Sequence, residues 1–196
     1  MAKAIVLMGI KHCGKSTQAF MLSKFFGVPC FDTDDLIFEL TGKSPRQIYS
    51  CGGEEAFKLA EKNACLELKA RLEKCPQNAD CKFAACVATG GGICNNPEAV
   101  EILKQFGILV FLNAEEQTAV KRILKEIKTD ADGKLFNMPA YIAKENPKNL
   151  NDVKKSFHRF YVERQKIYRS ICDICVEMGS APKIENRDAI IRALGS

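Results

Sequence analysis

Short apolar runs alternate along the chain with segments whose apolar residues recur every three or four positions. The apolar runs are typical of strands buried in a parallel sheet, and the other segments are typical of amphipathic helices. This alternation predicts an α/β fold in which a five-stranded parallel sheet carries helices on both faces. We expect strands at 4–8, 29–32, 84–88, 108–112 and 174–178, and helices that begin at Lys15, Thr33, Glu54, Pro97, Glu115, Asn151 and Asn186.

Two stretches interrupt this alternation. Residues 75–82 are polar (CPQNADCK) and predict a surface loop. Residues 128–149 are rich in proline, asparagine and charged residues and are too long for a simple connection, so we expect a mobile flap, or lid, there. A chain of 196 residues needs no second core, and we expect one domain that spans residues 1–196.

The segment GIKHCGKST, residues 9–17, follows the first apolar run directly. It fits the phosphate-binding pattern of Gly, four free positions, Gly, Lys and Ser or Thr, between a strand and a helix, where that pattern has its function. Backbone N–H groups from Gly9 and Gly14 to Thr17 can surround phosphate oxygens, Lys15 can reach the β- and γ-phosphates, and Ser16 can bind Mg²⁺. The helix that follows is expected to bury Ala19, Phe20, Leu22, Phe25 and Phe26.

The charge of the chain favours small anionic ligands over nucleic acid. The formal net charge is +5, from 29 Lys and Arg against 24 Asp and Glu, and no basic block concentrates it. No apolar run approaches the roughly 20 residues of a membrane span, and the first strand starts almost at once without a signal peptide. We therefore expect a monomer in the cytosol that associates with neither nucleic acid nor membrane.

Ten cysteines raise the possibility of disulfides or a zinc site. There is one CxxC spacing, at 172–175, and there are only two histidines, so a structural zinc site is disfavoured. The segment ICDICVEM, residues 171–178, is interpreted as a short buried strand in which cysteine serves as a small apolar residue. Free thiols in a reducing compartment are the expected state.

Three acids lie at the carboxyl end of the second predicted strand, in the segment Asp32-Thr33-Asp34-Asp35. Acids beside a phosphate-binding loop repel nucleotide unless a metal ion or substrate hydroxyl groups intervene. The N-terminus of a helix also favours Asp for capping and for its interaction with the helix dipole. Both roles can hold together, although capping alone does not require three acids.

Three successive glycines, Gly90, Gly91 and Gly92, close the third predicted strand. They expose bare backbone that a ligand can approach to contact distance. Alone, such a triplet indicates little more than a flexible turn. At the edge of the sheet that holds the phosphate-binding loop, it indicates part of a binding site.

The motifs GxxxxGKST, DTD, GEEAFK, ATGGG and ERxxxY occur in this order over nearly the whole chain, and together they resemble shikimate kinases. The resemblance implies the nucleoside-monophosphate-kinase-like fold and transfer of the ATP γ-phosphoryl group to the 3-hydroxyl group of shikimate, a hydroxy acid. It implies that Asp34 binds the substrate hydroxyls and serves catalysis, and that Asp32 lies near Mg²⁺. Gly90, Gly91 and Gly92 correspond to the substrate wall.

The resemblance also implies that Arg164 binds the substrate carboxylate and that Arg122 lies over the adenine. Two positions depart from the family pattern. Lys58 stands where the family has an arginine, and it loses the planar fork that holds a carboxylate at two points. The family's lid arginine, which touches the transferring phosphate, is missing, and Lys134, in the GKLF stretch at 133–136, is the candidate for this catalytic role.

Two other functions remain open at this point. The departures at Lys58 and in the lid suggest a kinase of another hydroxy acid or polyol, such as gluconate. A nucleotide-binding regulator without turnover is the other alternative. Because Asp34, the glycine triplet and Arg164 are all present, a pocket for a hydroxy acid is indicated, and a pure ATP binder has no use for one.

Overall fold

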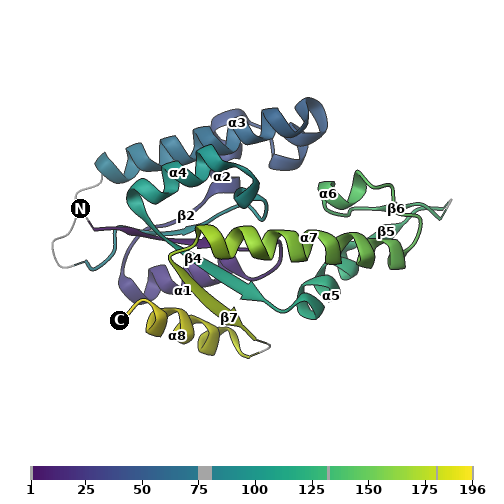
Figure 1. Ribbon diagram of the computed structural model, residues 1–196. Helices are drawn as coiled ribbons and strands as arrows, with labels where there is room; N and C mark the ends of the chain where they lie inside the picture. Colours follow the sequence, from purple (N-terminus) through teal and green to yellow (C-terminus); the bar gives the residue numbers. More distant parts are fainter. Residues whose placement is uncertain (1, 75–80, 132, 180, 196) are drawn as a thin grey trace.

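An open sheet of five parallel strands forms the centre of the computed structural model, which describes residues 2–74, 81–131, 133–179 and 181–195 (Figure 1). The strand order β2-β3-β1-β4-β7 places the fully buried β1 in the middle, and the predicted parallel sheet is confirmed. Its strands are β1 (Ala4–Met8), β2 (Cys30–Asp32), β3 (Cys86–Ala88), β4 (Gly107–Ala114) and β7 (Ile174–Met178). The loop expected at 75–82 falls mainly on 75–80, which lie outside the described residues.

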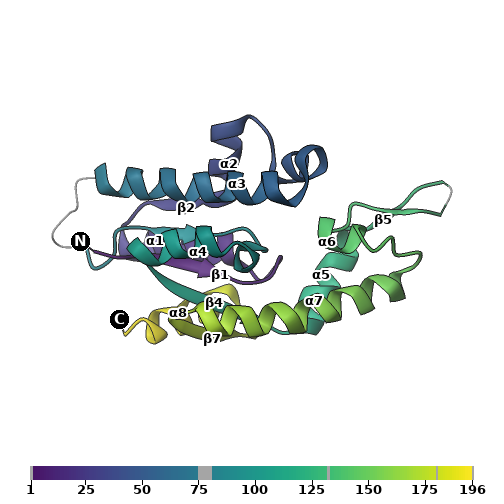
Figure 2. The same cartoon turned by 45° about the horizontal axis from the view of Figure 1, so that its top comes forward.

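Helices cover both faces of the sheet, as predicted. Helices α1 and α8 pack together on one face of the sheet, and α4 and α7 lie on the other (Figure 1). Helices α2 and α3 stack beyond α4 (Figure 2). Among the described residues, no helix is both long and apolar enough to cross a membrane. The helices are α1 (Lys15–Phe26), α2 (Thr33–Thr41), α3 (Pro45–Lys74), α4 (Pro97–Phe106), α5 (Glu116–Glu126), α6 (Ala140–Ala143), α7 (Leu150–Ile171), α8 (Lys183–Ala193) and the 3₁₀ helix η1 (Ile93–Asn95).

Two predicted buried surfaces differ in the structure. In α1, Ala19 and Leu22 are buried, but Phe20 and Phe25 are more than half exposed, because a period of 3.6 residues places them off the stripe that faces the sheet. The expectation of a buried strand at 171–178 is also wrong in part. Strand β7 is an edge strand, and its Val176 is buried while Cys175 is exposed.

Two segments are more ordered than the sequence predicts. Helix α3 begins at Pro45, and only its second part, after Gly53, matches the predicted start at Glu54; Gly53 interrupts the helix with a φ of 74°. The stretch at 128–149 contains the antiparallel strands β5 (Lys128–Thr129) and β6 (Leu135–Phe136) as well as α6. The lid segment is therefore a hairpin followed by a short helix.

Candidate active site

The phosphate-binding loop joins β1 to α1 at the centre of the sheet. Gly9 has a φ of 148°, and a Cβ there would lie 2.7 Å from the backbone oxygen of Leu112, so a larger residue would displace β4. Gly14 caps α1 in the left-handed conformation, with a φ of 99°. Lys15 Nζ donates hydrogen bonds to the backbone oxygens of Gly9 (3.0 Å) and Ile10 (2.9 Å). The buried ammonium group therefore lies across the loop, where it can exchange these carbonyls for phosphate oxygens.

Two side chains whose oxygen atoms could bind a metal ion lie beside the start of α1. Ser16 Oγ donates a hydrogen bond to Asp32 Oδ2 at 2.7 Å, and Asp32 Oδ1 accepts one from the backbone N–H of Asp34 at 3.0 Å. Asp32 therefore caps α2 and also faces Ser16. A hydroxyl and a carboxylate side by side fit Mg²⁺, which takes few protein oxygens and completes its shell with phosphate and water. No cluster of three or more His, Cys, Asp or Glu suited to a metal occurs in the described part of the chain.

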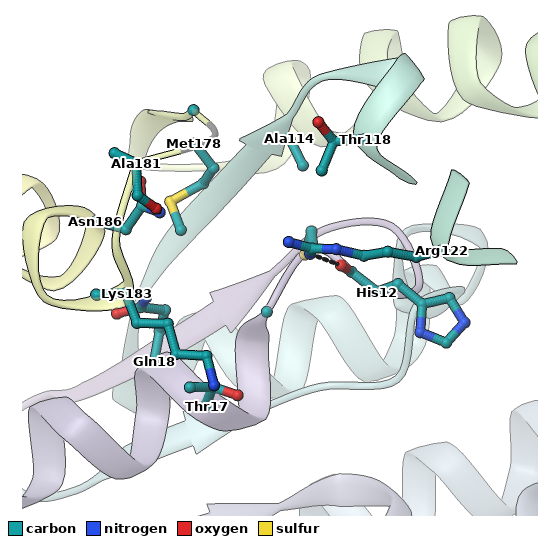
Figure 3. Close-up of a pocket in the computed structure, with 13 residues that line it drawn as sticks. His12, Thr17, Gln18, Ala114, Thr118, Arg122, Met178, Ala181, Lys183 and Asn186 are labelled. Carbon is teal, nitrogen blue, oxygen red and sulfur yellow. Dashed lines mark hydrogen bonds between the residues drawn. The ribbon is translucent and has the colours of Figure 1, made fainter. Parts of the chain in front are cut away.

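A cavity of about 450 Å³ borders the loop between α5 and the connection from β7 to α8 (Figure 3). Arg122 reaches across from α5, and its Nη1 donates a hydrogen bond to the backbone oxygen of His12. Figure 3 shows Met178 and Asn186 on the opposite side. The cavity suits a nucleotide base and is called the nucleotide cavity below. Arg122 lines it, and its place over the adenine stays a prediction. The sequence analysis did not name Met178 or Asn186 as site residues. Met178 ends the last parallel strand, and ligands of open α/β sheets bind at the carboxyl ends of the strands, so this position was an available signal.

A second cavity, of about 530 Å³, is lined by parts of α3, α7, the glycine triplet and the lid segment. The loop borders it at Lys11. Five residues predicted for the substrate site contribute to its wall, although they come from distant parts of the sequence: Asp34, Lys58, Gly91, Gly92 and Arg164. The cavity is called the acceptor cavity below.

The glycine triplet is packed closely by protein atoms. A Cβ on Gly91 would lie 2.7 Å from the backbone N of Lys11, so the phosphate-binding loop rests directly on this residue. The Gly90 N–H donates a hydrogen bond to Thr33 Oγ1 at 3.0 Å, which ties the triplet to the start of α2. A Cβ on Gly92 would lie 3.9 Å from Arg164 Nη2. The triplet therefore lets the loop, the acids and the arginine meet around one cavity.

Arg164 places a buried cation in the acceptor cavity and is only 6% exposed. Its Nη1 donates a hydrogen bond to the backbone oxygen of Gly91 at 3.3 Å, and the guanidinium carbon lies 4.2 Å from the ring centroid of Tyr141 in α6. Arg164 Nε has no hydrogen-bond partner among the described residues. A buried, stacked guanidinium with an unused donor suits a planar carboxylate, and its contact with Tyr141 places the lid over the cavity.

Two carboxyl groups converge on Gly90. A Cβ on Gly90 would lie 3.1 Å from both Asp34 Oδ1 and Glu61 Oε1. Burial of the carboxyl group, followed by the charge of Asp32, raises the pKa of Asp34 to about 6. Burial also raises the pKa of Glu61 to about 7, although Asn96 Nδ2 donates a hydrogen bond to Glu61 Oε2 at 3.1 Å. Acids tuned in this way can exchange protons with hydroxyl groups near neutral pH.

Comparison with known proteins assigns the chain to a family. A model described as shikimate kinase matches residues 11–195. The chain belongs to the shikimate kinase family. The shikimate kinase of Francisella tularensis subsp. novicida (strain U112) is 27% identical over 179 residues, which cover 91% of this chain and 87% of the relative. The predicted family resemblance is therefore confirmed.

Solved shikimate kinases have the same fold. The enzyme from Aquifex aeolicus is 26% identical, with a TM-score of 0.67 and coverage of 98% of this chain and 96% of that one. The enzyme from Acinetobacter baumannii, solved in complex with shikimate, is 22% identical, with a TM-score of 0.73 and coverage of 99% and 93%. These likenesses confirm the predicted nucleoside-monophosphate-kinase-like fold.

Lys58, for which the family resemblance implies an arginine, lines the acceptor cavity. Its Nζ lies 3.2 Å from Glu54 Oε1 and 3.6 Å from Glu55 Oε1. The hydrogen bond that Lys58 donates to Glu54 raises the pKa of Lys58, so the side chain stays protonated. This member of the family therefore keeps a cation at the acceptor cavity, but two acids compete with a ligand for it.

Lys134 is the predicted site residue that the structure does not bring to the others. It is exposed, lines neither cavity and directly precedes β6. The β5–β6 hairpin extends away from the sheet in both views (Figures 1 and 2). A catalytic role for Lys134 stays a prediction.

Glu61 is a site residue that the sequence analysis missed. It lies on α3 within the stripe formed by buried Ala60, Ala64, Cys65 and Leu68. A single glutamate inside an apolar stripe at helical spacing was the available signal, because a charge is placed in a core only when something there requires it.

Glu61→Gln is expected to change the pH dependence of stability. The pKa of Glu61 rises on folding from 4.5 to about 7, so its stabilising effect is complete below 4.5 and is lost as the pH rises through 7. The variant cannot ionise and can still accept the hydrogen bond from Asn96. Its free energy of unfolding relative to the wild type should therefore increase by on the order of 2 kcal/mol between pH 5 and pH 8.

Urea denaturation at the two pH values measures this difference. Glu73→Gln, on the exposed side of the same helix, is the matched control and should show no such change. A stability difference for Glu61→Gln that is the same at both pH values would contradict the raised pKa.

Proposed function

We propose that this chain transfers the γ-phosphoryl group of ATP to the 3-hydroxyl group of shikimate, with Mg²⁺ as cofactor. The observation that carries the proposal is one cavity, beside the phosphate-binding loop, with carboxyl groups at Gly90 and the buried guanidinium of Arg164 in its wall. A hydroxy acid matches that pair of groups, because acids accept hydrogen bonds from hydroxyls and a guanidinium binds a carboxylate. Membership of the shikimate kinase family supports shikimate as the hydroxy acid.

Catalysis by this site is mainly alignment and charge. In the transition state, negative charge spreads over the γ-phosphoryl oxygens, and Lys15 stabilises it when its ammonium group leaves the loop carbonyls for the phosphates. Asp34 orients the acceptor hydroxyl and accepts its proton. Ser16 and Asp32 would hold Mg²⁺, directly and through water, and the ion supplies further positive charge to the phosphates.

The lid segment has a separate task. Tyr141 in α6 stacks on Arg164, so the lid contacts a residue that binds the acceptor. A lid closed over both substrates excludes water, which would otherwise accept the phosphoryl group.

An acceptor screen tests the proposal against its alternatives. Thermal shift of the protein with an ATP analogue plus shikimate, gluconate or related hydroxy acids reports binding, and a coupled assay of ADP release reports turnover. Shikimate should give both signals. Turnover with another hydroxy acid alone would support a remodelled kinase, and nucleotide binding without turnover would support a regulator.

Lys58→Arg is expected to lower the KM for shikimate several-fold while the KM for ATP changes little. The guanidinium fork can bind a carboxylate at two points, whereas the lysine makes one point contact and is shared with Glu54 and Glu55. Initial rates over a range of each substrate measure both constants.

Arg164→Lys is the reverse experiment in the same cavity. It replaces the two-point guanidinium contact by a single ammonium contact and should therefore raise the KM for shikimate. This rise should exceed the fall in KM expected for Lys58→Arg, because Arg164 is the more buried cation. An unchanged KM for shikimate in both variants would show that neither side chain binds the carboxylate.

A further inference from the structure

Phosphoryl transfer requires positive charge near the reacting phosphoryl group, and five lysine and arginine side chains among the described residues line the acceptor cavity. Four of them are engaged by the walls of the cavity. Arg46 donates hydrogen bonds to the lid at Asn137 Oδ1 (2.8 Å) and at the backbone oxygen of Met138 (3.3 Å). Lys58 and Lys144 pair with the carboxylate of Glu54, and Arg164 stacks on Tyr141. The fifth is Lys11.

Lys11 belongs to the phosphate-binding loop itself, four positions before Lys15. Its backbone N and Cα would lie 2.7 Å and 3.0 Å from a Cβ on Gly91, so this part of the loop rests on the wall of the acceptor cavity. Burial raises the pKa of Asp34 to about 6, and the charges of Lys15 and Lys11 oppose that rise. Lys11 therefore lies close to the carboxylate that orients the acceptor and to the loop that holds the donor.

The ion pair that Lys11 makes is weak enough to exchange. Lys11 Nζ lies 3.6 Å from Glu126 Oε2, and the two side chains are 48% and 44% exposed. Exposed pairs of this kind contribute little to stability. Glu126 ends α5, and its backbone oxygen accepts a hydrogen bond from Asn137 Nδ2 in the lid segment at 2.9 Å. A phosphoryl group with two negative charges competes well with a single half-exposed carboxylate.

We propose that Lys11 is a catalytic cation that leaves Glu126 to contact the γ-phosphoryl group during transfer, the role that the family resemblance suggested for Lys134. The inference rests on the proposed kinase activity. In the reaction, the acceptor oxygen bonds to the γ-phosphorus, the bond to the bridging oxygen breaks, and its electron pair leaves with ADP. Lys11 stabilises charge on the non-bridging oxygens and neither gains nor loses a proton.

Lys11→Met removes the charge and keeps a side chain of similar length. It should lower kcat about tenfold or more and change the KM for ATP less than about threefold, because the contact strengthens in the transition state. Lys11→Arg keeps the charge and should retain most of the activity. Lys125→Met, which removes one charge from the exposed side of α5, is the matched control and should have the activity of the wild type.

Lys134→Met provides the competing result. A large loss of kcat in Lys134→Met together with normal kcat in Lys11→Met would overturn the proposal. Equal losses in Lys11→Met and Lys11→Arg would also overturn it, because the charge would then be irrelevant.

A binding measurement tests the role of Lys11 independently of whether shikimate is the acceptor. Titration calorimetry with ADP and with the β,γ-imido analogue of ATP gives the preference for the γ-phosphoryl group, and Lys11→Met should reduce that preference by about two- to threefold, in line with the small change expected in the KM for ATP. If the wild type does not phosphorylate shikimate and the preference still falls, the acceptor is wrong and the assignment of Lys11 is supported. If shikimate is phosphorylated and neither kcat nor the preference changes, Lys11 has no such role.

Discussion

Lys15→Ala is expected to lower kcat by about a hundredfold or more, equivalent to on the order of 3 kcal/mol of transition-state stabilisation. The ammonium group lies 2.9 and 3.0 Å from two carbonyl oxygens of the loop, in the position from which it can reach the β- and γ-phosphates. Because alanine supplies no charge there, the oxygens of the transferring group lose their buried counter-charge. Coupled ADP release at saturating substrates measures the loss.

The control for Lys15→Ala is its thermal stability, since removal of Lys15 also leaves the oxygens of Gly9 and Ile10 without their donor. A folded variant with turnover close to that of the wild type would contradict the assignment of the loop as the ATP site.

Asp34→Asn is expected to lower kcat by a factor of about 10² to 10⁴, the usual contribution of a positioned general base. The amide keeps the shape of the side chain but cannot accept the hydroxyl proton. Nucleotide affinity should stay nearly constant, because Asp34 lines the acceptor cavity and not the nucleotide cavity. Single-turnover rates together with the affinity for ADP separate the two effects.

The same residue determines the expected pH dependence. The pKa of Asp34 is raised to about 6, so the carboxyl group is protonated below that pH and cannot act as a base. The kcat/KM of the wild type should therefore fall as the pH drops through about 6, and this limb should be absent from the residual activity of Asp34→Asn.

Asp32→Asn is the matched control for Asp34→Asn. Asp32 faces Ser16 and should affect the Mg²⁺ concentration needed for half-maximal activity. If Asp32→Asn removed the acid limb and Asp34→Asn changed the Mg²⁺ requirement, the roles of the two acids would be reversed.

Local patterns were sufficient to predict the strands of the sheet and the loop that follows β1. A fully apolar run such as 4–8 has few stable places other than the centre of a parallel sheet, and Gly9 is required there because a Cβ would meet β4. The prediction for Arg122 came from the family resemblance. The structure places it on the helix after β4, where it lines the cavity beside the loop, and its place over the adenine stays a prediction.

Features that depend on contacts between distant segments were not predictable. The apolar stripe around Glu61 on α3 was a local signal of its burial, but its place beside Gly90 and Asp34 depends on where α3 packs. The exposure of Phe20 depends on which side of α1 meets the sheet, and the position of Lys134 depends on how the β5–β6 hairpin leaves the core. Packing decides each of these.

The measurement that tests the account most directly is ³¹P NMR of the protein incubated with ATP, Mg²⁺ and shikimate. We expect one new phosphomonoester resonance, coupled to the proton on carbon 3 of shikimate, which grows with the ADP signals in equal amount and is absent with Lys15→Ala. Release of inorganic phosphate without a phosphomonoester, or a phosphomonoester formed from gluconate but not from shikimate, would contradict the proposed function.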